Sequence, residues 1–552
     1  MIATQTKTFE FTGTELLIDS ILAEKTEVVF GSISGSMQNL YDPFDKCKQL
    51  KQVILEHEQA TIHAADGYAR ATGKTGVAYI PPGSAMTNAI TGVLTAQIDS
   101  VPLVIITLHE ENLDLFGLTT PVTKYYLRID DISEIQQTLS EAFSIANEGR
   151  PGAVVVEMAT DVLIKQTNAT APKVMKQHRE IEESPLPIKT IERVKAEILA
   201  AKKPVLFIGG GVISANASML VRELVDRTKI PVVSTLMGLG AFPANHPLFL
   251  GMLGMHGTFA ANKSVHRADL LICLGVRFSD RVTGKLNGFS PKSRKIQIDI
   301  DAAEINKNIN IDLPIVGDVY TVLSQLLDQE IPSDTTEWIK ETSSWQKIAP
   351  RFSDSKSELK PQQVIQLVDE YSSEKAIVAT DVGQHQIWTA HNYKFNHPRT
   401  FVTSGGLGTM GFGLPAAIGA ALATDNNEVI LVSGDGSFQM NYQELATVAK
   451  YQLPIKIVIL KNGYLGMVRQ WQEMFYKGRY SSVKISSPDF ITLAKAYGLE
   501  TGRAANLLEA KTAIQQAFSH HHPTVIEFDV TEEENVFPIV PPGKNNTDTI
   551  LN

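Results

Sequence analysis

The sequence predicts an α/β protein that is built from three doubly wound parallel-sheet domains. The chain has 552 residues, which is enough for three domains of ordinary size. Short runs rich in Val, Ile and Leu alternate with amphipathic helical stretches along the chain. Two polar stretches, 165–187 and 332–359, separate three segments of this kind. We therefore expect domains at 1–168, 188–335 and 360–552.

Each segment contains several short apolar runs of the length and composition that parallel strands have. In the first segment, strands are predicted at 27–31, 75–80, 102–108 and 152–158, with a helix at 58–72. In the second, they are predicted at 204–211, 231–236, 269–276 and 295–301. In the third, they are predicted at 376–383, 428–436, 455–460 and 524–530. No short-period repeat is visible, although the first and third segments share one general plan.

Composition argues against several functional classes. The chain carries 50 basic and 60 acidic residues, a formal net charge of -10, and no basic block, so nucleic acid is not an expected partner. Its two cysteines, Cys47 and Cys273, cannot form a disulfide framework, which favours a reducing compartment. The first residues show no signal or transit pattern, and glycines and a proline interrupt the apolar run 407–424. A cytoplasmic protein without a membrane span is expected.

The strongest chemical signal is a Gly-Asp-Gly turn, Gly434 to Gly436, followed by Asn462. Asp435 and Asn462 each follow a predicted strand, so both should lie at the same edge of a parallel sheet. A carboxylate and an amide oxygen are suitable ligands for a Mg²⁺ ion that bridges a diphosphate. The alternative is a tight turn in which Asp435 caps the helix that starts near Ser437.

This Asp/Asn spacing resembles the thiamine diphosphate motif, and longer stretches resemble the catalytic subunit of one family, acetohydroxyacid synthase, also called acetolactate synthase. The resemblance covers nearly the whole chain and includes HEQATIHAADGYARATGKTGV, TLMGLGAFP, GMLGMHGT, LGVRFSDRVTGK, DVGQHQIW, SGGLGTMGFGLPAAIGAA, GMVRQWQ and VPPG. It implies a pyrimidine-binding domain, a central FAD-binding-like domain and a diphosphate-binding domain. It also implies decarboxylation of pyruvate and transfer of the two-carbon unit to a second 2-oxo acid, as in branched-chain amino-acid biosynthesis.

The resemblance implies roles for residues of the third segment. Asp435 and Asn462 would bind Mg²⁺ together with the backbone at Tyr464, within a turn formed by Gly434, Gly436 and Ser437. Gln384 and His385 would hold the diphosphate, although they could also be ordinary polar loop residues. Met410 would be the apolar wedge that keeps the cofactor bent, and Gly408 would offer its carbonyl to the aminopyrimidine; core packing is an equally compatible role for Met410.

Glu58 is the expected catalytic residue. A carboxylic acid held against the aminopyrimidine ring can shuttle the proton that activates the cofactor. The alternative is a solvated Glu near a helix start. In the family this Glu reaches the cofactor of a neighbouring subunit, so the resemblance implies a homodimer or homotetramer with active sites between chains.

The second segment resembles a flavin-binding domain in which FAD need not act in redox chemistry. A glycine turn after a strand permits close approach of a nucleotide. Asp299 and Asp301 end a predicted strand and could bind a nucleotide's polar groups, or could equally cap a turn. The other residues expected near the flavin are Gly209, Gly210, Leu236, Met237, Met255, His256 and Arg277.

Four residues resemble the family's substrate pocket. Arg281 could bind the carboxylate of the acceptor 2-oxo acid, and Trp471 could restrict its alkyl group. Met467 and Val468 would wall the same pocket. A surface Arg and a helix-packing Trp are the alternative.

The first segment departs from the family's pattern on the substrate side. Residues 32–36 and 81–88 differ from it, the loop 108–124 is shortened, and Ala159 and Thr160 replace a Pro-Lys pair. In the third segment, Lys461 replaces an Asn that is common in the family. These changes motivate an alternative, a paralogous carboligase or decarboxylase that acts on a different 2-oxo acid. A non-catalytic subunit is a third hypothesis, disfavoured because Glu58, Asp435 and Asn462 are all retained.

Two further points stay open at the level of sequence. The C-terminal stretch 536–552 resembles a tail that folds over the site, yet its Pro and polar residues also fit an unstructured end. Relatives of this type commonly bind a small regulatory subunit, and nothing in this chain indicates where one would dock.

Overall fold

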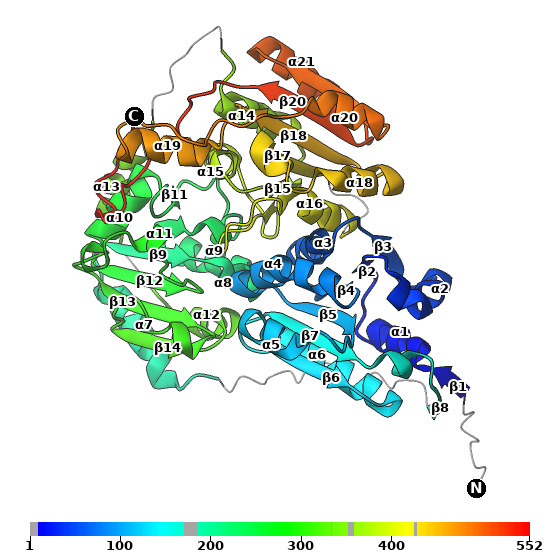
Figure 1. Cartoon of the computed structure of the whole chain (residues 1–552). Coiled ribbons are helices and arrows are strands. Elements are labelled where there is room, and N and C mark those ends of the chain that lie inside the picture. The colour runs from blue at the N-terminus through cyan, green and yellow to red at the C-terminus, as the bar shows by residue number, and fades with distance from the viewer. Residues whose placement is uncertain (1–8, 170–184, 333, 351–357, 424–427) are drawn as a thin grey trace.

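The computed structural model describes residues 9–169, 185–332, 334–350, 358–423 and 428–552. Figure 1 shows three α/β units, each built on one six-stranded parallel sheet, so the predicted fold class is confirmed. Residues 1–8, most of the predicted linker 165–187 and part of the stretch 332–359 lie outside the described residues. The exact domain boundaries stay a prediction.

The first sheet has the strand order β3-β2-β4-β5-β7-β6 and is covered by helices on both faces. Helices α3 and α4 pack on one face, and α1 and α6 pack on the other. Because both faces are buried, the central strands read as continuous apolar runs. The strands are β2 (Val28–Gly31), β3 (Lys51–Ile54), β4 (Gly76–Tyr79), β5 (Leu103–Leu108), β6 (Tyr125–Ile129) and β7 (Ala153–Met158). The helices are α1 (Gly13–Ala23), α2 (Gln38–Lys46), α3 (Glu58–Thr72), α4 (Ser84–Asp99), α5 (Leu115–Thr119) and α6 (Ile135–Asn147), with 3-10 turns η1 (Gly35–Met37), η2 (Thr120–Val122), η3 (Ile132–Glu134) and η4 (Thr160–Leu163). A separate antiparallel pair joins β1 (Phe9–Thr12) to β8 (Gln166–Ala169).

The central sheet has the order β11-β10-β9-β12-β13-β14. Counted along the chain, this is the doubly wound order 3-2-1-4-5-6, in which the direction of winding reverses between β9 and β12. The strands are β9 (Pro204–Ile208), β10 (Val232–Ser234), β11 (Phe249–Met252), β12 (Leu270–Leu274), β13 (Arg294–Asp299) and β14 (Leu313–Val316). The helices are α7 (Ile188–Ala200), α8 (Gly210–Ser214), α9 (Ser218–Thr228), α10 (Phe259–Arg267), α11 (Asp280–Thr283), α12 (Val319–Leu327) and α13 (Thr336–Gln346), with 3-10 turns η5 (Leu236–Gly238), η6 (Leu286–Gly288) and η7 (Ala302–Glu304).

The third sheet has the order β16-β15-β17-β18-β20-β19, which repeats the strand order of the first sheet. Its winding reverses between β15 and β17. The strands are β15 (Ile377–Thr380), β16 (Phe401–Val402), β17 (Val429–Gly434), β18 (Ile455–Lys461), β19 (Glu500–Ala504) and β20 (Thr524–Asp529). The helices are α14 (Pro361–Tyr371), α15 (Gln384–Asn392), α16 (Gly413–Leu422), α17 (Asp435–Phe438), α18 (Leu445–Tyr451), α19 (Gly466–Phe475), α20 (Phe490–Ala496) and α21 (Leu507–Phe518), with the 3-10 turn η8 (Tyr442–Glu444).

Helices α3 and α16 join the first unit to the third through a close backbone contact. A Cβ atom at Gly67 would lie 2.2 Å from the carbonyl oxygen of Ala416, and one at Gly419 would lie 1.9 Å from that of Ala64. Larger residues at these positions would force the helices apart, because backbone atoms cannot turn away as a side chain can. Small residues thus allow α3, which begins at Glu58, to lie directly on the third unit.

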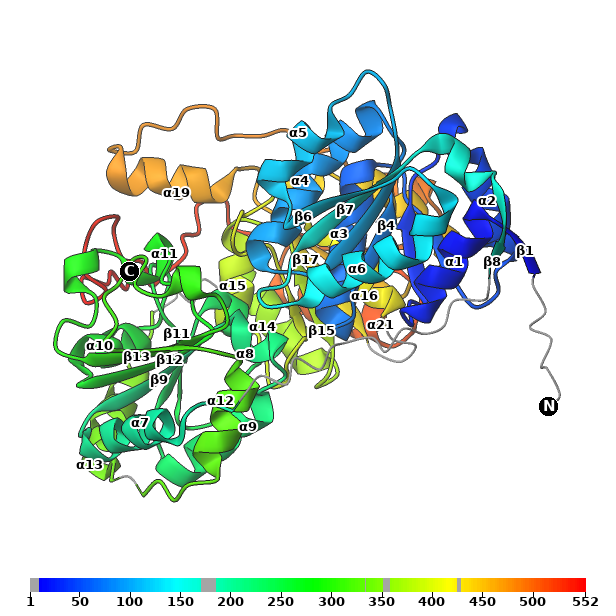
Figure 2. The same ribbon diagram turned by 90° about the horizontal axis from the view of Figure 1, so that it is seen from below.

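The C-terminal segment crosses from the third unit to the central one. Figure 2 shows this red segment running between α19 and α11. Val540 N–H donates to the Met255 carbonyl (2.7 Å), and Lys285 N–H donates to the Lys544 carbonyl (3.0 Å). These contacts exclude the unstructured end that the sequence left open. Among the described helices, none combines the length and the apolar composition that a membrane crossing requires.

Candidate active site

The predicted diphosphate residues and the Gly-Asp-Gly turn meet at the point where the third sheet reverses its winding. Strand β15 leads into Gln384 and His385, and strand β17 leads into Asp435. The turns lie so close that a Cβ atom at Gly434 would be 2.8 Å from His385 Nδ1. Ligands of doubly wound sheets bind at the carboxyl ends of the strands beside such a reversal, so this crevice is the candidate active site.

Asp435, Asn462 and Tyr464 lie together at this sheet edge. Asp435 Oδ2 accepts hydrogen bonds from Gly463 N–H (3.1 Å) and Ser487 Oγ (2.7 Å), and Asn462 Oδ1 accepts one from Tyr464 N–H (3.1 Å). Burial raises the pKa of Asp435, whose exposed fraction is 1 %. Within the described ranges no Lys, Arg or His forms an ion pair with this carboxylate. A buried carboxylate beside an amide oxygen, without a side-chain cation, fits a divalent metal ion.

Gln384 and His385 each leave a buried polar atom without a partner. Both N–H groups of Gln384 are used, since its Nε2 donates to Gln470 Oε1 and to the Glu534 carbonyl, each at 3.0 Å. Gln384 Oε1 and His385 Nε2 have no hydrogen-bond partner in the structure. Burial lowers the pKa of His385 to about 3, so its ring is neutral. Unpaired buried polar atoms are rare in folded proteins, so these two atoms indicate a site where a bound ligand supplies the missing hydrogen-bond partners.

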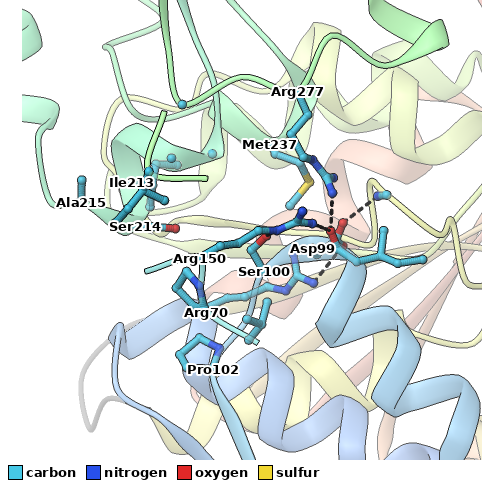
Figure 3. A pocket seen from close by; sticks show the side chains of 18 of the residues that line it. Arg70, Asp99, Ser100, Pro102, Arg150, Ile213, Ser214, Ala215, Met237 and Arg277 are labelled. Atoms are coloured by element: carbon cyan, nitrogen blue, oxygen red, sulfur yellow. Dashed lines mark hydrogen bonds and ion pairs between the residues drawn. The ribbon is translucent and has the colours of Figure 1, made fainter. Parts of the chain in front are cut away.

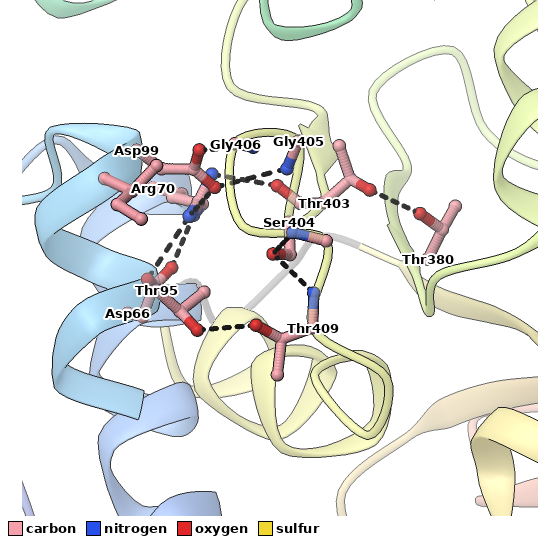
Figure 4. A network of polar contacts seen from close by, with 12 residues as sticks. Asp66, Arg70, Thr95, Asp99, Thr380, Thr403, Ser404, Gly405, Gly406 and Thr409 are labelled. Atoms are coloured by element: carbon pink, nitrogen blue, oxygen red, sulfur yellow. Dashed lines mark hydrogen bonds and ion pairs between the residues drawn. The ribbon is translucent and has the colours of Figure 1, made fainter. Parts of the chain in front are cut away.

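The loop that carries Gly408 and Met410 is held by hydrogen bonds from within and from the first unit (Figure 4). Ser404 Oγ accepts from the N–H groups of Gly408 (3.2 Å) and Thr409 (3.1 Å). Thr409 also exchanges a hydroxyl hydrogen bond of 2.7 Å with Thr95 on α4. Gly408 has a φ of 76°, a conformation that favours glycine, so the loop's path depends on this residue. Met410, at the end of this loop, is half-buried.

A buried ion-pair chain in the first unit supports the same loop (Figure 4). Arg70 forms ion pairs with Asp66 and, at 2.9 Å, with Asp99, and the two carboxylates have side-chain exposures of 0 %. Its Nη1 donates to the Thr403 carbonyl at 2.9 Å. Asp99 in turn accepts from the N–H groups of Gly405 (3.2 Å) and Gly406 (2.7 Å). Sequence reasoning missed this chain, although an Asp/Arg pair at i,i+4 within the small-residue helix 58–72 is a visible signal.

Glu58 and the Met410 loop contact different residues of α4. It is the first residue of α3, is half-buried, and accepts a hydrogen bond from Asn88 Nδ2 at 3.1 Å. Asn88 and Thr95 are both on α4, about 10 Å apart along the helix axis, and Thr95 contacts Thr409. Among the described residues, no hydrogen bond joins Glu58 to the loop that carries Met410.

A cavity of about 1560 Å³ lies where the three units meet and opens onto the winding reversal of the central sheet. Of the residues predicted near a flavin, seven line it: Gly210, Leu236, Met237, Met255, His256, Arg277 and Asp299. Gly209 lies beneath it, where a Cβ would be 2.2 Å from the Gly275 carbonyl, and Asp301 caps η7 through Ala303 N–H (2.9 Å). Burial raises the pKa of Asp299 to about 6 and lowers that of His256 to about 4.

Three arginines converge on the end of α4 in this cavity (Figure 3). Arg277 Nη1 and Arg150 Nη2 both donate to the Ile98 carbonyl, at 2.5 and 3.2 Å. Arg70 reaches the neighbouring Asp99. The contacts of Arg150 with Ile98 and of Arg70 with Asp99 are not predicted from sequence, because the partners are 52 and 29 residues apart. The cavity therefore combines arginines, which are paired in part with Asp99 and Glu304, with an apolar surface that includes Met237.

The predicted substrate residues lie on two different cavities. Met467, Val468 and Trp471 share the outer side of α19 and line a hollow of about 710 Å³. Arg281 lines the larger cavity instead, with its side chain 64 % exposed. The inner side of α19 carries Arg469 and Gln470, both 0 % exposed, and Gln470 exchanges hydrogen bonds with Val536 of the C-terminal segment.

Comparisons with known proteins agree with this arrangement. The chain matches the families described as thiamine pyrophosphate enzyme N-terminal TPP binding domain, central domain and C-terminal TPP binding domain, over residues 11–120, 191–326 and 381–528. It is 40% identical to the acetolactate synthase large subunit of Haemophilus influenzae over 98% of both chains. It is 41% identical to that of Cyanidium caldarium, over 97% of this chain and 96% of the relative. It is 42% identical to the acetolactate synthase of Mycobacterium leprae, over 97% of this chain and 90% of the relative. The chain thus belongs to the acetolactate synthase large-subunit family of thiamine diphosphate-dependent enzymes.

Proposed function

We propose that the protein decarboxylates pyruvate and transfers the two-carbon unit to a second 2-oxo acid, forming 2-acetolactate or 2-aceto-2-hydroxybutyrate, as in branched-chain amino-acid biosynthesis. The observation that carries this proposal is the meeting of Gln384, His385 and Asp435 at one crevice, in a chain related to acetolactate synthases over its whole length. Thiamine diphosphate, when bound, supplies a carbon nucleophile that stabilises the negative charge left by loss of CO₂.

In this proposal, Asp435, Asn462 and the Tyr464 carbonyl hold Mg²⁺. The unpaired Gln384 Oε1 is an acceptor, so it would pair with a hydrogen-bond donor of the ligand rather than with a phosphate oxygen. The phosphate oxygens are met by backbone N–H groups at the starts of α15 and α17, where helix dipoles favour negative charge. Met410 and Gly408 orient the rest of the cofactor.

Glu58 holds and moves the proton at the cofactor's aminopyrimidine ring. The family resemblance described above implies an active site that two copies complete, with Glu58 of one copy facing the Met410 loop of the other. The protein is then a homodimer or a pair of such dimers. Asn88 keeps the Glu58 carboxylate in place while leaving one of its oxygens available.

The large cavity is proposed to hold FAD in a structural, non-redox role. Its position at the reversal of a sheet with the order 3-2-1-4-5-6 supports a dinucleotide ligand. Arg277 and Arg150 offer charge to a diphosphate, and Asp299 offers an acceptor to hydroxyl or amino groups. Met237 and Met255 supply the apolar surface that a ring system needs.

Arg281 and the outer side of α19 are proposed to serve the acceptor 2-oxo acid, although in this structure they line separate cavities. Arg281 would hold its carboxylate, and Trp471 with Met467 and Val468 would limit its alkyl group. The shortened stretch 108–124, which forms α5 and η2, and the exposed Thr160 favour one alternative, a different 2-oxo acid as donor or acceptor. A cytoplasmic location and a small regulatory subunit are proposed from the large-subunit relatives.

The test is NMR analysis of the products that purified protein forms from pyruvate, alone and with 2-oxobutyrate, in the presence of thiamine diphosphate, Mg²⁺ and FAD. We expect 2-acetolactate and 2-aceto-2-hydroxybutyrate. Glu58→Gln should reduce formation of both products to a small residual rate while binding of thiamine diphosphate, measured by calorimetry, is retained. Binding without any product from wild-type protein would refute pyruvate as the donor, and full activity of Glu58→Gln would refute the role of Glu58.

A further inference from the structure

We propose that Glu444 is a positioning residue that fixes Glu58, through hydrogen bonds to the backbone from which α3 begins. Glu444 ends the 3-10 turn η8 and its exposed fraction is 0 %. It lies nine residues after Asp435, in the segment that starts with the Gly-Asp-Gly turn. Its carboxylate is aimed at the turn between β3 and α3, which belongs to the first unit.

Both carboxylate oxygens of Glu444 are engaged. Oε1 accepts from the N–H groups of Glu56 (3.2 Å) and His57 (3.1 Å). Oε2 accepts from Thr447 Oγ1 at 2.7 Å and from Glu56 N–H at 3.3 Å. No ion pair to Glu444 is formed by any residue that the structure describes. Two adjacent backbone donors directed at one buried acceptor fix the path of the chain, because removing the acceptor would leave both donors unpaired.

A second contact holds the same turn. The Tyr451 hydroxyl accepts from Ile54 N–H at 3.0 Å, so the end of β3 rests on α18, and Figure 1 shows these two elements side by side. His57 then caps α3 by accepting from Gln59 N–H through Nδ1 at 3.2 Å. Leu55 N–H donates to the Gly31 carbonyl at 2.9 Å, so every residue from Ile54 to His57 has a backbone N–H that is held by a hydrogen bond. Glu58 follows at once, with its own carboxylate on Asn88.

The contact joins two parts of the chemistry within one chain. The segment 435–444 begins at the candidate metal ligand and ends at the residue that holds the Glu58 turn. If Glu58 serves the cofactor of a second copy, the segment 435–444 connects the metal ligand of one active site to the catalytic acid of the other. A change at Asp435 could then alter the position of Glu58. That consequence rests on the proposed function, whereas the contact itself does not.

The charge state of Glu444 reflects the same geometry. Burial raises its pKa to about 7, while the donors Thr447, Glu56 and His57 lower it and the nearby Glu56 charge raises it further. The hydrogen bonds from these donors therefore offset part of the free-energy cost of burying the charged carboxylate.

The contact can be tested by hydrogen exchange of the cofactor-free, full-length protein, followed by mass spectrometry of peptides that span 53–60. We expect the amides of Glu56 and His57 to exchange about tenfold faster or more in Glu444→Ala, with a smaller increase in Glu444→Gln. Glu428→Gln is the matched control, because Glu428 also accepts from a backbone amide, Ser373 N–H at 2.9 Å, away from α3. It should leave this peptide unchanged. Unchanged exchange in Glu444→Ala would overturn the inference.

A double-mutant cycle tests whether Glu444 acts through Glu58. Glu444→Gln should lower kcat about tenfold, while the KM for pyruvate and the Kd for thiamine diphosphate stay within about twofold. In a Glu58→Gln background the same change should have no further effect on the residual rate. Multiplying losses would overturn the positioning role. Full activity of Glu58→Gln would remove the catalytic consequence, and the exchange result would still decide whether Glu444 orders the turn.

Discussion

Replacement of Arg70 by Met should weaken both the fold and the binding of thiamine diphosphate. The side chain of Arg70 is only 9 % exposed and lies between the fully buried carboxylates of Asp66 and Asp99. Removing one partner of a buried ion pair typically costs about 3–5 kcal/mol, because the remaining charge is left without compensation. Here two carboxylates would remain, so the upper end of that range is expected.

The effect on the cofactor follows from one contact. Arg70 Nη1 donates to the Thr403 carbonyl at 2.9 Å, at the start of the loop that leads to Gly408 and Met410. A hydrogen bond from a charged group is worth about 1.5–3 kcal/mol, so its loss should raise the Kd for thiamine diphosphate by about 10- to 150-fold.

Calorimetric titration of Arg70→Met with thiamine diphosphate and Mg²⁺ would measure this change, and a thermal unfolding scan would measure the loss of stability. The variant should be most damaged at high pH. Burial raises the pKa of Asp66, so its protonation at low pH removes part of the uncompensated charge. Lys46→Met is the control, because its ion pair with Asp42 is 73 % and 71 % exposed and is worth little. An unchanged Kd and an unchanged unfolding temperature for Arg70→Met would refute the reasoning.

Three other changes have defined outcomes. Gly419→Ala should lower the unfolding temperature markedly, because its Cβ would lie 1.9 Å from the Ala64 carbonyl. Gly35→Ala is the control and should not lower it, because no atom lies within 4 Å of its Cβ. Equal unfolding temperatures for the two variants would contradict the close helix contact. Asp435→Asn should raise the Mg²⁺ concentration needed for cofactor binding by about 100-fold in calorimetry, and Mg²⁺-independent binding would count against the metal site. Burial raises the pKa of Asp299 to about 6, so this residue stabilises the folded state most when it is protonated. The stability of the flavin-free wild type relative to Asp299→Asn should therefore fall as the pH rises from about 4 through 6. A difference in denaturation midpoints that stays constant over this range would exclude the titration.

Patterns confined to one stretch of chain could be predicted. The strand before Asp435 is predicted at 428–436 and found at Val429–Gly434, because a strand buried on both faces must be apolar along its whole length. Edge strands are not predicted, because they are not buried on both faces and need not be apolar along their whole length. Strand β6 has only one buried residue, Ile129, and includes Arg128, and β19 carries Glu500 and Arg503, so neither reads as a continuous apolar run.

Contacts between distant residues were not predictable. Asp99 bonds to Gly406, and Glu444 bonds to His57, only because α3 and α4 lie against the third unit. No local sequence pattern indicates that α3 and α4 pack against the third unit. The sequence also gives no sign that both N–H groups of Gln384 are used inside the protein, which changes what this side chain can offer a ligand. The positions of the site residues could be predicted, but their hydrogen-bonding roles could not.

The path of the C-terminal segment has a consequence for the order in which the protein assembles during synthesis. The central sheet is complete at Val316, yet its cavity is bordered by Met255 and His256, which contact Val540 and Pro538. A ribosome adds these residues after the last strand of the third sheet, which ends at Asp529. Each sheet can form while the chain is still growing, since domains generally fold as units during translation. The wall of the cavity beside Met255 can close only after Pro538 and Val540 have been made, so a ligand there would be enclosed later than the central sheet forms.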